Sequence, residues 1–271
     1  MTDLKKYPNF QAFKYKEFMR QNNYFDKHWT DNFLEEIPDS KKAVAKKFLS
    51  PVLGDIFLYE NICILEGGCG DGVHSKVIKE SGTLKEGSLL VGMDVSMAAL
   101  RVARQRTKEN RMFICGDISK MPFSNNQFDM AFSYGVLAYT QDPFKSFSEL
   151  CRVVKPGGRL GIWMASQHKG LGGWLFRLVR KICRATGPFG TRMIGHLIVP
   201  FLVLLPTNSK VNLSNANWQQ CLEVVLVNIS PENLYFPDRE KIISWFEEKN
   251  ISIISQDEEN PITVWGRKSE L

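Results

Sequence analysis

Cysteine spacing of the zinc-binding or disulfide type is missing from this sequence. Its six cysteines form no Cys-x-x-Cys pair and no cysteine–histidine cluster with zinc-ligand spacing. Several of them lie in apolar runs, where cysteine usually acts as a small core residue. The pattern predicts no metal site, and a reducing cytoplasm is the simplest compartment for unpaired thiols.

Long apolar runs are missing as well. The first 17 residues contain no apolar core of the signal-peptide type. The longest apolar run, 194–205, is interrupted by glycine, histidine and proline and falls short of the ~20 residues that a membrane-spanning helix needs. Hydrophobic residues make up 44% of the 271 residues and charged residues 24%, which is ordinary for a soluble globular protein. The length suits one large α/β domain with an insertion, or two small domains.

Acidic residues are absent between Glu149 and Glu223. This stretch has a local charge of +10, and because the net charge is +6, the rest of the chain sums to 6 − 10 = −4. Such a localised positive field suggests an anionic partner, namely a membrane surface, a phosphorylated substrate or nucleic acid. A solvated basic face is the alternative. The ten basic residues are Arg152, Lys155, Arg159, Lys169, Arg177, Arg180, Lys181, Arg184, Arg192 and Lys210.

From residue 62 onward, short apolar runs alternate with helical patterns, which predicts a parallel sheet with helices on both faces. In such sheets, ligands bind outside the carboxyl ends of the strands, where the strand order reverses. The expected strands are 62–65, 88–93, 112–115, 128–133, 159–164, 251–255 and 262–265. The expected helices are 97–106 with Ser96 as N-cap, 143–154 ended by Pro156-Gly157-Gly158, and 238–249 with Asp238 as cap.

The first of these strands runs into a glycine-rich turn, Glu66 to Gly72, with glycines at 68, 70 and 72. Glycine allows a positive φ and a close approach of a ligand to the backbone. The helix that follows directs its free N–H groups and positive dipole end at a carboxylate or a phosphate in the turn. The dinucleotide pattern GxGxxG would need a glycine at position 73, where this chain has Val73.

Two aspartates follow later strands. Asp94 ends the second strand, 94 − 72 = 22 residues beyond Gly72, where a carboxylate can accept both hydroxyls of a ribose. Asp117 and the backbone N–H of Ile118 follow the third strand and can meet the edge of an adenine. A loop or helix cap is the alternative role for Asp117.

Together these features resemble the class I S-adenosylmethionine-dependent methyltransferase family, in its small-molecule, type-11-like form. The resemblance rests on 66–72, Asp94, Gly116-Asp117, 121–143 and 152–163, and covers roughly 60–165. It implies a Rossmann-like, doubly wound, seven-stranded, mostly parallel sheet, with S-adenosyl-L-methionine as cofactor. The cofactor-binding residues that it implies are Glu66, Gly68, Cys69, Gly70 and Gly72 at the methionine part, Asp94 and Val95 at the ribose, Asp117 and Ile118 at the adenine, and Ser133 and Tyr134 beside the methyl group.

Family members often have a histidine in the loop after the fourth strand, but this chain has Tyr139 there. Tyr139 either orients the methyl acceptor or packs as an aromatic residue. His168, just after the fifth strand, is the preferred candidate for a general base, and Tyr139 is the second catalytic candidate. His74 follows the glycine turn and either approaches the cofactor or is a plain helix residue.

About seventy residues, 166–236, separate the fifth strand from the last helix, which is longer than a usual loop. Within them, 169–184 predicts an amphipathic helix that begins at Trp174, with Trp174, Leu175, Leu178, Val179 and Ile182 on one face and Arg177, Arg180, Lys181 and Arg184 on the other. This pattern is typical both of a membrane-surface helix and of a helix that caps a hydrophobic site.

The predicted organisation is an N-terminal helical lid (1–58), a methyltransferase core (59–165 and 237–271) and a helical substrate-cap insertion (166–236). In the first segment, 43–49 is helical, Pro51 and Gly54 end the pattern, and the aromatic stretch 24–29 either covers the cofactor or docks as an ordinary helix.

The functional hypothesis is methyl transfer to oxygen or nitrogen of a small acceptor that is apolar or lipid-linked. An RNA-directed methyltransferase that uses the basic insertion, and a non-catalytic cofactor-binding module, are the alternatives. Nucleic acid is the less favoured partner because no RNA-binding module is recognisable. No [DN]PP[YF] motif and no Pro-Cys dipeptide occur, which argues against amide or adenine methylation and against cytosine-C5 chemistry. The expected location is the cytoplasm, including the inner face of a membrane through 169–184.

Overall fold

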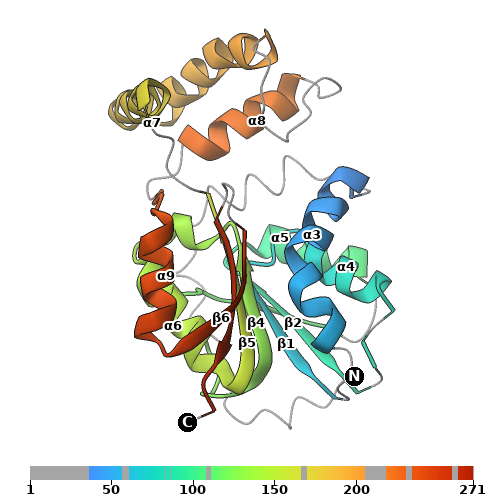
Figure 1. Ribbon diagram of the computed structural model, residues 1–271. Helices are drawn as coiled ribbons and strands as arrows, with labels where there is room; N and C mark the ends of the chain where they lie inside the picture. The colour runs from blue at the N-terminus through green and yellow to red at the C-terminus, as the bar shows by residue number, and fades with distance from the viewer. Residues whose placement is uncertain are drawn as a thin grey trace. The chain divides into compact units, whose positions relative to one another are not determined.

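The computed structural model describes residues 37–56, 61–82, 84–85, 87–107, 111–165, 170–204, 218–229, 234–257 and 262–270. The chain divides into two compact units (Figure 1). The first comprises Met1–Ser166 together with Tyr235–Leu271, and the second comprises Gln167–Leu234.

The first unit is built on a seven-stranded sheet in the order β3-β2-β1-β4-β5-β7-β6. Strand β7 is antiparallel to both of its neighbours, and the pairs from β3 to β5 are parallel. The predicted fold class, a Rossmann-like and mostly parallel sheet, is therefore confirmed. The strands are β1 (Cys63–Gly67), β2 (Leu89–Asp94), β3 (Arg111–Cys115), β4 (Phe128–Tyr134), β5 (Val154–Met164), β6 (Ile251–Gln256) and β7 (Ile262–Lys268).

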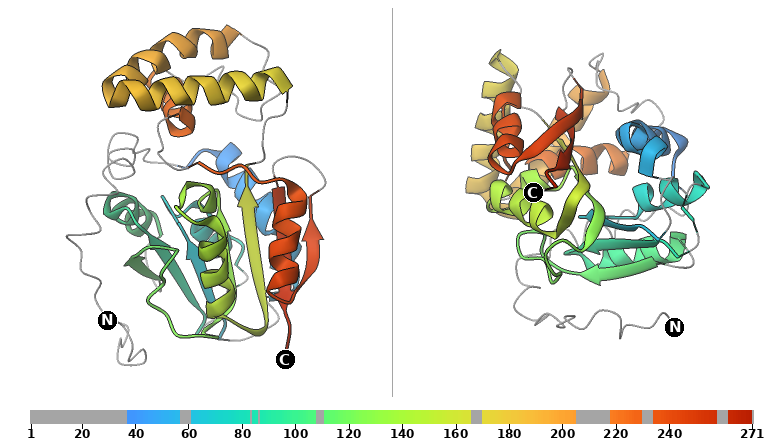
Figure 2. Two further views of the ribbon diagram at one scale, coloured as in Figure 1. Left: turned by 90° about the vertical axis from the view of Figure 1, so that its left-hand side faces the viewer. Right: turned by 60° about the horizontal axis from the view of Figure 1, so that its bottom comes forward.

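Helices cover both faces of this sheet, as Figures 1 and 2 show. One face carries α3 (Asp39–Ile56), α4 (Val73–Glu80) and α5 (Met97–Thr107), and the other carries α6 (Pro143–Val153) and α9 (Arg239–Glu248). A short 3-10 helix, η2 (Leu137–Tyr139), follows β4. Strand order reverses between β1 and β4, and this is the switch point at which doubly wound sheets bind ligands.

Helix α3 lies within the predicted N-terminal lid segment, and it packs as part of the core. Leu49 and Val52 are fully buried with side chains of α4 and the sheet. The prediction that Pro51 and Gly54 end this helix is wrong, because α3 continues to Ile56. Proline removes a backbone N–H, and the Ser50 hydroxyl donates instead to the carbonyl of Lys47 at 2.8 Å. Residues 24–29 lie outside the described residues.

Strand β5 begins earlier than predicted. Val154 follows α6 directly and pairs with Phe128, and the register then shifts before Arg159 pairs with Met130. The segment Pro156-Gly157-Gly158 therefore lies in an irregular part of the strand, whereas we predicted that it separates helix from strand. A Cβ at Gly158 would lie 2.9 Å from the carbonyl oxygen of Asp129, so a glycine is required where these backbones approach each other.

The second unit consists of α7 (Gly170–Leu204) and α8 (Trp218–Ile229) among its described residues. Gly187 has a non-helical backbone (φ 68°, ψ −171°) and divides α7 into two segments. Cys183, Val199 and Leu222 lie in the small core between α7 and α8. None of the helices in the described part of the chain is long and apolar enough to cross a membrane.

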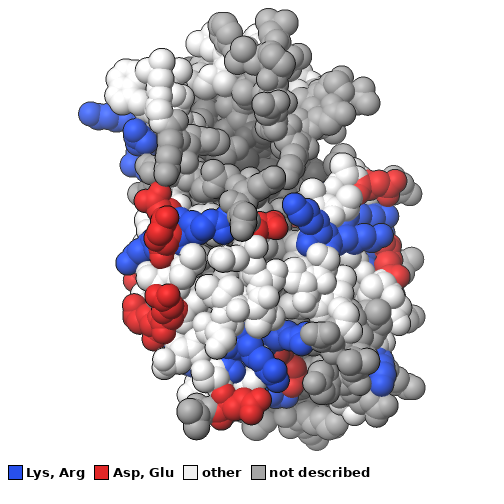
Figure 3. Space-filling view, in the orientation of Figure 1, with Lys and Arg blue, Asp and Glu red and all other residues white. Residues whose placement is uncertain are grey.

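Arg180 corrects the predicted faces of α7. We expected it on the polar face, but it is buried at 6% exposure and donates to the carbonyl of Asn228 at 2.7 Å. This carbonyl belongs to the last turn of α8, where a helix dipole favours a cation. Val179 of the predicted apolar face also packs on the core, whereas Trp174, Leu175, Leu178 and Ile182 are exposed. On the face drawn in Figure 3, blue Lys and Arg atoms lie at the edge of this unit, near α7 in Figure 1.

Candidate functional site

The glycine turn after β1 has the backbone that its sequence predicts. Gly68, Gly70 and Gly72 all have positive φ (76°, 50° and 75°). The N–H groups of Gly68 and Cys69 both donate to the carbonyl of Met93, which ties the turn to the end of β2. A Cβ at Gly68 would clash with the side chain of Val136. The positive φ and this clash both require a glycine at position 68.

Asp94 lies against this turn. One carboxylate oxygen accepts the Gly70 N–H at 2.8 Å and the other accepts the Ser96 N–H at 2.9 Å. The side chain is buried, and burial raises the pKa of Asp94 to about 6, although these two hydrogen bonds act in the opposite direction. A carboxylate has about four lone-pair sites, and the backbone hydrogen bonds from Ser96, Gly70 and Val95 do not occupy all of them. The predicted contact of Asp94 with a ribose stays a prediction.

Glu66 forms a buried polar cluster with the first turn of α4. Its carboxylate lies 2.9 Å from Nδ1 of His74 and accepts the hydroxyl of Ser75 at 2.8 Å. Glu66 is 1% exposed and His74 is 5% exposed. The carboxylate therefore orients the His74 ring beneath the glycine turn. The predicted contact of Glu66 with the methionine part of the cofactor stays a prediction.

Asp71 connects the turn to two helices. Its carboxylate makes ion pairs of 2.6 Å with Lys41 of α3 and with Arg106 of α5. Burial by itself would raise the pKa of Asp71, but the two cations and their hydrogen bonds bring it below its usual value. The carboxylate is thus ionised at neutral pH and fixes the outer side of the turn.

Asp117 follows β3 at the same edge of the sheet. Its carboxylate accepts the N–H of Ser119 at 2.8 Å, so Asp117 caps a turn, as its alternative role predicted. Ile118 is buried, and its side chain lies where a Cβ at Gly67 would be. This bond involves neither the second carboxylate oxygen of Asp117 nor the backbone N–H of Ile118. The contacts of this pair with adenine stay a prediction.

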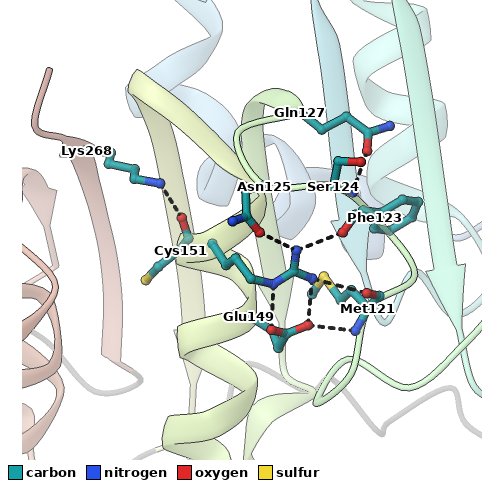
Figure 4. Close-up of polar contacts among 9 residues, drawn as sticks. Met121, Phe123, Ser124, Asn125, Gln127, Glu149, Cys151 and Lys268 are labelled. Carbon is teal, nitrogen blue, oxygen red and sulfur yellow. Dashed lines mark hydrogen bonds and ion pairs between the residues drawn. The ribbon is translucent and has the colours of Figure 1, made fainter. Parts of the chain in front are cut away.

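The loop after Asp117 is held by an ion pair that the sequence prediction missed. Arg152 of α6 binds Glu149 through two nitrogens (2.7 and 2.8 Å) and donates to the carbonyls of Phe123 and Met121. Glu149 also accepts the N–H of Met121 at 2.8 Å. In Figure 4, dashed lines join both Asn125 and Glu149 to one guanidinium group, which belongs to Arg152. These bonds, with the Arg152 contact first among them, lower the pKa of Glu149 against the opposing effect of its burial. The spacing i, i+3 on a helix was the one signal in the sequence.

Ser133 and Tyr134 end β4, beside the turn. Tyr134 stacks on Trp163 with ring centroids 4.5 Å apart and lies 4.7 Å from the His74 ring. Burial raises the pKa of Tyr134 to about 12, so its hydroxyl stays protonated at neutral pH and acts as a donor rather than a base. Ser133 Oγ and His74 Nε2 are fully buried and have no hydrogen-bond partner among the described residues.

The remaining predicted site residues lie in varied places. Val95 is half-buried after Asp94, and its carbonyl lies 3.5 Å from the Cys115 thiol. Cys69 is buried, and burial raises the pKa of its thiol well above the usual value, so it stays a neutral thiol. Tyr139 is half-buried in η2, where its N–H donates to Val136. His168 lies outside the described residues.

Comparison with known proteins identifies this arrangement. Residues 65–162 match the family model described as "Methyltransferase domain". A malonyl-[acyl-carrier protein] O-methyltransferase of Herminiimonas arsenicoxydans is 38% identical over 98 residues, which is 36% of this chain and 35% of that protein. A demethylmenaquinone methyltransferase of Renibacterium salmoninarum is 34% identical over 98 residues, covering 36% and 38%. The matched part thus spans little more than a third of these relatives.

A solved structure resembles the fold over most of the chain. Magnesium protoporphyrin IX methyltransferase of Synechocystis, with bound SAH, has a TM-score of 0.57 at 14% identity and covers 94% of this chain and all of that one. Residues 65–162 thus match a methyltransferase domain, and the sheet order and the glycine turn of the structure agree with that match.

The residues present fit S-adenosylmethionine as the cofactor. Asp94 retains acceptor capacity at the carboxyl end of β2. The buried hydroxyl of Ser133 has no hydrogen-bond partner among the described residues. Buried polar groups are rarely left unpaired. A ligand that brings hydroxyl, amino and carboxyl groups to this edge would supply the missing partners.

Proposed function

We propose that this protein transfers the methyl group of S-adenosylmethionine to an oxygen or nitrogen of a small acceptor that is apolar or lipid-linked. The observation that carries the proposal is the position of Asp94, Asp117 and Ser133 at the carboxyl ends of neighbouring strands. Asp94 ends β2, Asp117 lies two residues beyond β3 and Ser133 is the next-to-last residue of β4. The sheet order 3-2-1-4 places these strand ends along one edge around β1, which leads into the glycine turn.

In this proposal, the chain's own residues bind and orient. Asp94 accepts the ribose hydroxyls, Asp117 and the N–H of Ile118 meet the adenine, and the glycine turn lies at the methionine part. The bound cofactor supplies an activated methyl group on a sulfonium. Tyr134 and the aromatic residues around it exclude water from this point and hold the acceptor atom in line.

An oxygen or nitrogen acceptor also has to lose a proton, for which a nearby base helps. Tyr134 is unsuited to this role because its pKa of about 12 keeps it protonated. His168 and Tyr139 remain the proposed candidates from the sequence. Replacing each in turn, as His168→Gln and Tyr139→Phe, should lower kcat more than it weakens cofactor binding if the residue acts on the acceptor.

The names of two relatives state the acceptors on which those proteins act. By their names, they act on a malonyl group of an acyl-carrier protein and on demethylmenaquinone. Their alignments cover 36% of this chain, and the family match at residues 65–162 ends before the second unit begins. The acceptor must therefore be identified by experiment.

The test is a transfer assay with cofactor labelled in the methyl group. The protein is mixed with the lipid extract, the acyl-carrier-protein fraction, the small metabolites and the RNA of a cell lysate. Label is expected in the lipid or carrier-linked fraction, and Asp94→Asn is the matched control that should abolish it. Label that ribonuclease releases would refute the proposed acceptor and favour the RNA-directed alternative. Absence of label from every pool would refute the proposed activity.

A further inference from the structure

Helix α7 presents three separate sectors along its first segment, and among the described residues one of these sectors packs on the core with α8. At about 100° per residue, Phe176, Val179 and Cys183 lie together and face the small core with α8. Arg180 lies in the same sector, where its guanidinium binds the end of α8. This sector accounts for the attachment of α7 to its own unit.

The second sector is apolar and exposed. Leu171, Trp174, Leu175, Leu178 and Ile182 follow helical spacing and lie about 130° around the helix from the core sector. Leu171 is 81% exposed, and Trp174 and Leu175 are 54% and 53% exposed. Single exposed apolar residues are ordinary, but a continuous row of five over three turns is not.

The third sector is basic. Arg177, Lys181 and Arg184 are exposed and lie about 110° from the centre of the apolar sector, on the side away from the core. No Asp or Glu occurs anywhere in α7. The apolar row is therefore bordered by cations and by no opposite charge of its own helix.

The same arrangement returns after the break at Gly187. Phe189, Met193 and Leu197 are exposed at intervals of four residues, with exposures of 81%, 51% and 68%, and Arg192 is exposed beside them. Thr191, Gly195 and Val199 are the buried side of this segment. Both segments of α7 thus keep one side for the core and present an apolar row with flanking cations.

We propose that this surface of α7 docks on an anionic lipid surface, with the apolar row in the acyl–headgroup boundary and the cations among the phosphates. The charge of the flanking residues selects this occupant, because a second copy of the chain would bring cations against cations. A helix that lies in the interface needs an apolar side and a basic side, and it need not be long enough to cross the bilayer. The proposal concerns the second unit by itself, and its test does not depend on methyl transfer.

The experiment measures binding of the full chain to vesicles. Vesicles of phosphatidylglycerol and phosphatidylcholine (1:1) are compared with vesicles of phosphatidylcholine alone, by co-sedimentation at low salt. The wild type should bind the anionic vesicles at least tenfold more tightly. The double variant Arg177→Gln/Lys181→Gln should bind about 25-fold more weakly, because each cation near such a surface contributes about fivefold. Lys46→Gln/Arg101→Gln removes two exposed cations from α3 and α5 and is the matched control that should bind like the wild type.

The apolar row is tested in the same assay. Trp174→Ser/Leu178→Ser should reduce binding at least tenfold, whereas Val44→Ser/Ile254→Ser, two exposed apolar residues of the first unit, should not. Bromine-labelled lipid should quench wild-type fluorescence more than that of Trp174→Phe. Calorimetric cofactor binding and the melting temperature verify that each variant is folded. Equal binding to both kinds of vesicle, or a dimer that the serine variant dissociates while vesicle binding persists, would overturn the proposal.

Discussion

With Asp94 at the ribose, as proposed, the raised pKa of its carboxyl group should make cofactor affinity depend on pH in a range where an ordinary aspartate would have no effect. Burial raises this pKa to about 6. An ionised carboxylate only accepts hydrogen bonds, whereas a protonated carboxyl group carries an O–H donor and has fewer acceptor sites for the ribose hydroxyls. The binding-competent fraction is then about 97% at pH 7.5 and about 9% at pH 5. Because the apparent Kd is the intrinsic Kd divided by this fraction, the Kd should rise about tenfold between these pH values. That corresponds to about 1.4 kcal/mol.

The assay is isothermal titration of the cofactor product, S-adenosylhomocysteine, at half-unit steps from pH 7.5 to 5. The free amino-acid part of the ligand ionises outside this range, its amino group above pH 7.5 and its carboxyl group below pH 5, so neither group changes its charge during the titration. Asp94→Asn should bind more weakly at pH 7.5 and show no further loss on acidification. Histidine is the other residue type that changes charge in this range, so His74→Gln is the second control and should keep the acid loss.

An ordinary aspartate pKa of about 3.9 would change the Kd by less than about 10% at pH 5. A flat Kd in the wild type would therefore refute the assignment of Asp94 as a buried ribose acceptor. An acid loss that persists in Asp94→Asn would refute it in a different way, because another group would then be responsible.

Three further predictions follow from the geometry of the turn and its loop. Gly68→Ala should lower the free energy of unfolding by about 2–4 kcal/mol and abolish cofactor binding, because it combines a positive φ with a clash against Val136. Gly82→Ala is the control, because Gly82 also has a positive φ (+67°) but open space around it, and it should cost only about 1 kcal/mol and leave binding unchanged. Equal melting temperatures for the two variants would contradict this prediction. Asp71→Asn should cost about 3 kcal/mol in urea unfolding at pH 7, because it leaves Arg106 buried without its carboxylate. Since the folded pKa of Asp71 is lowered, the stabilisation is present above the unfolded pKa of about 3.9 and is lost as pH falls through the folded value; a cost that stays constant down to pH 3 would contradict the ion-pair origin. Arg152→Met should lower the free energy of unfolding by about 2–3 kcal/mol and weaken cofactor binding, because the 121–127 loop loses its hydrogen bonds to the guanidinium. Arg104→Met replaces an exposed residue of α5 and should change neither the stability nor the Kd. An unaltered Kd in Arg152→Met would show that the loop does not position the adenine site.

Local patterns predicted the sheet, and the strand ends that carry the proposed cofactor residues, because these features depend on short segments. Ile64 and Leu65 run into glycines, Asp94 and Asp117 follow apolar runs, and each of these features lies within a few residues of its neighbours in sequence. Alternation of such segments restricts the fold to a parallel sheet, since connections of this length cross over on its faces. The general handedness of these connections decides on which face of the sheet each crossover helix lies, whereas the doubly wound strand order was implied by the family resemblance.

Local patterns misjudged the points at which distant segments supply a missing partner. Pro51 is tolerated in α3 because Ser50 caps the carbonyl that proline leaves free and because the helix packs on the sheet. The start of β5 is set by its pairing with Phe128, which no window around Pro156 contains. Tertiary packing overrides weak propensities in both cases.

The sequence by itself determined the class of fold and the cofactor, because glycine conformation, strand ends and acidic residues act over short distances. Only the tertiary structure decided which of the polar residues work together. It joined Glu66 to His74 and Asp71 to Lys41, and it turned Arg180 inward to the end of α8. The physical reason is that burial and pairing depend on residues that lie across the core and are distant in sequence. The hydrophobic pattern of a helix does not by itself say which side is buried until the neighbouring element is in place.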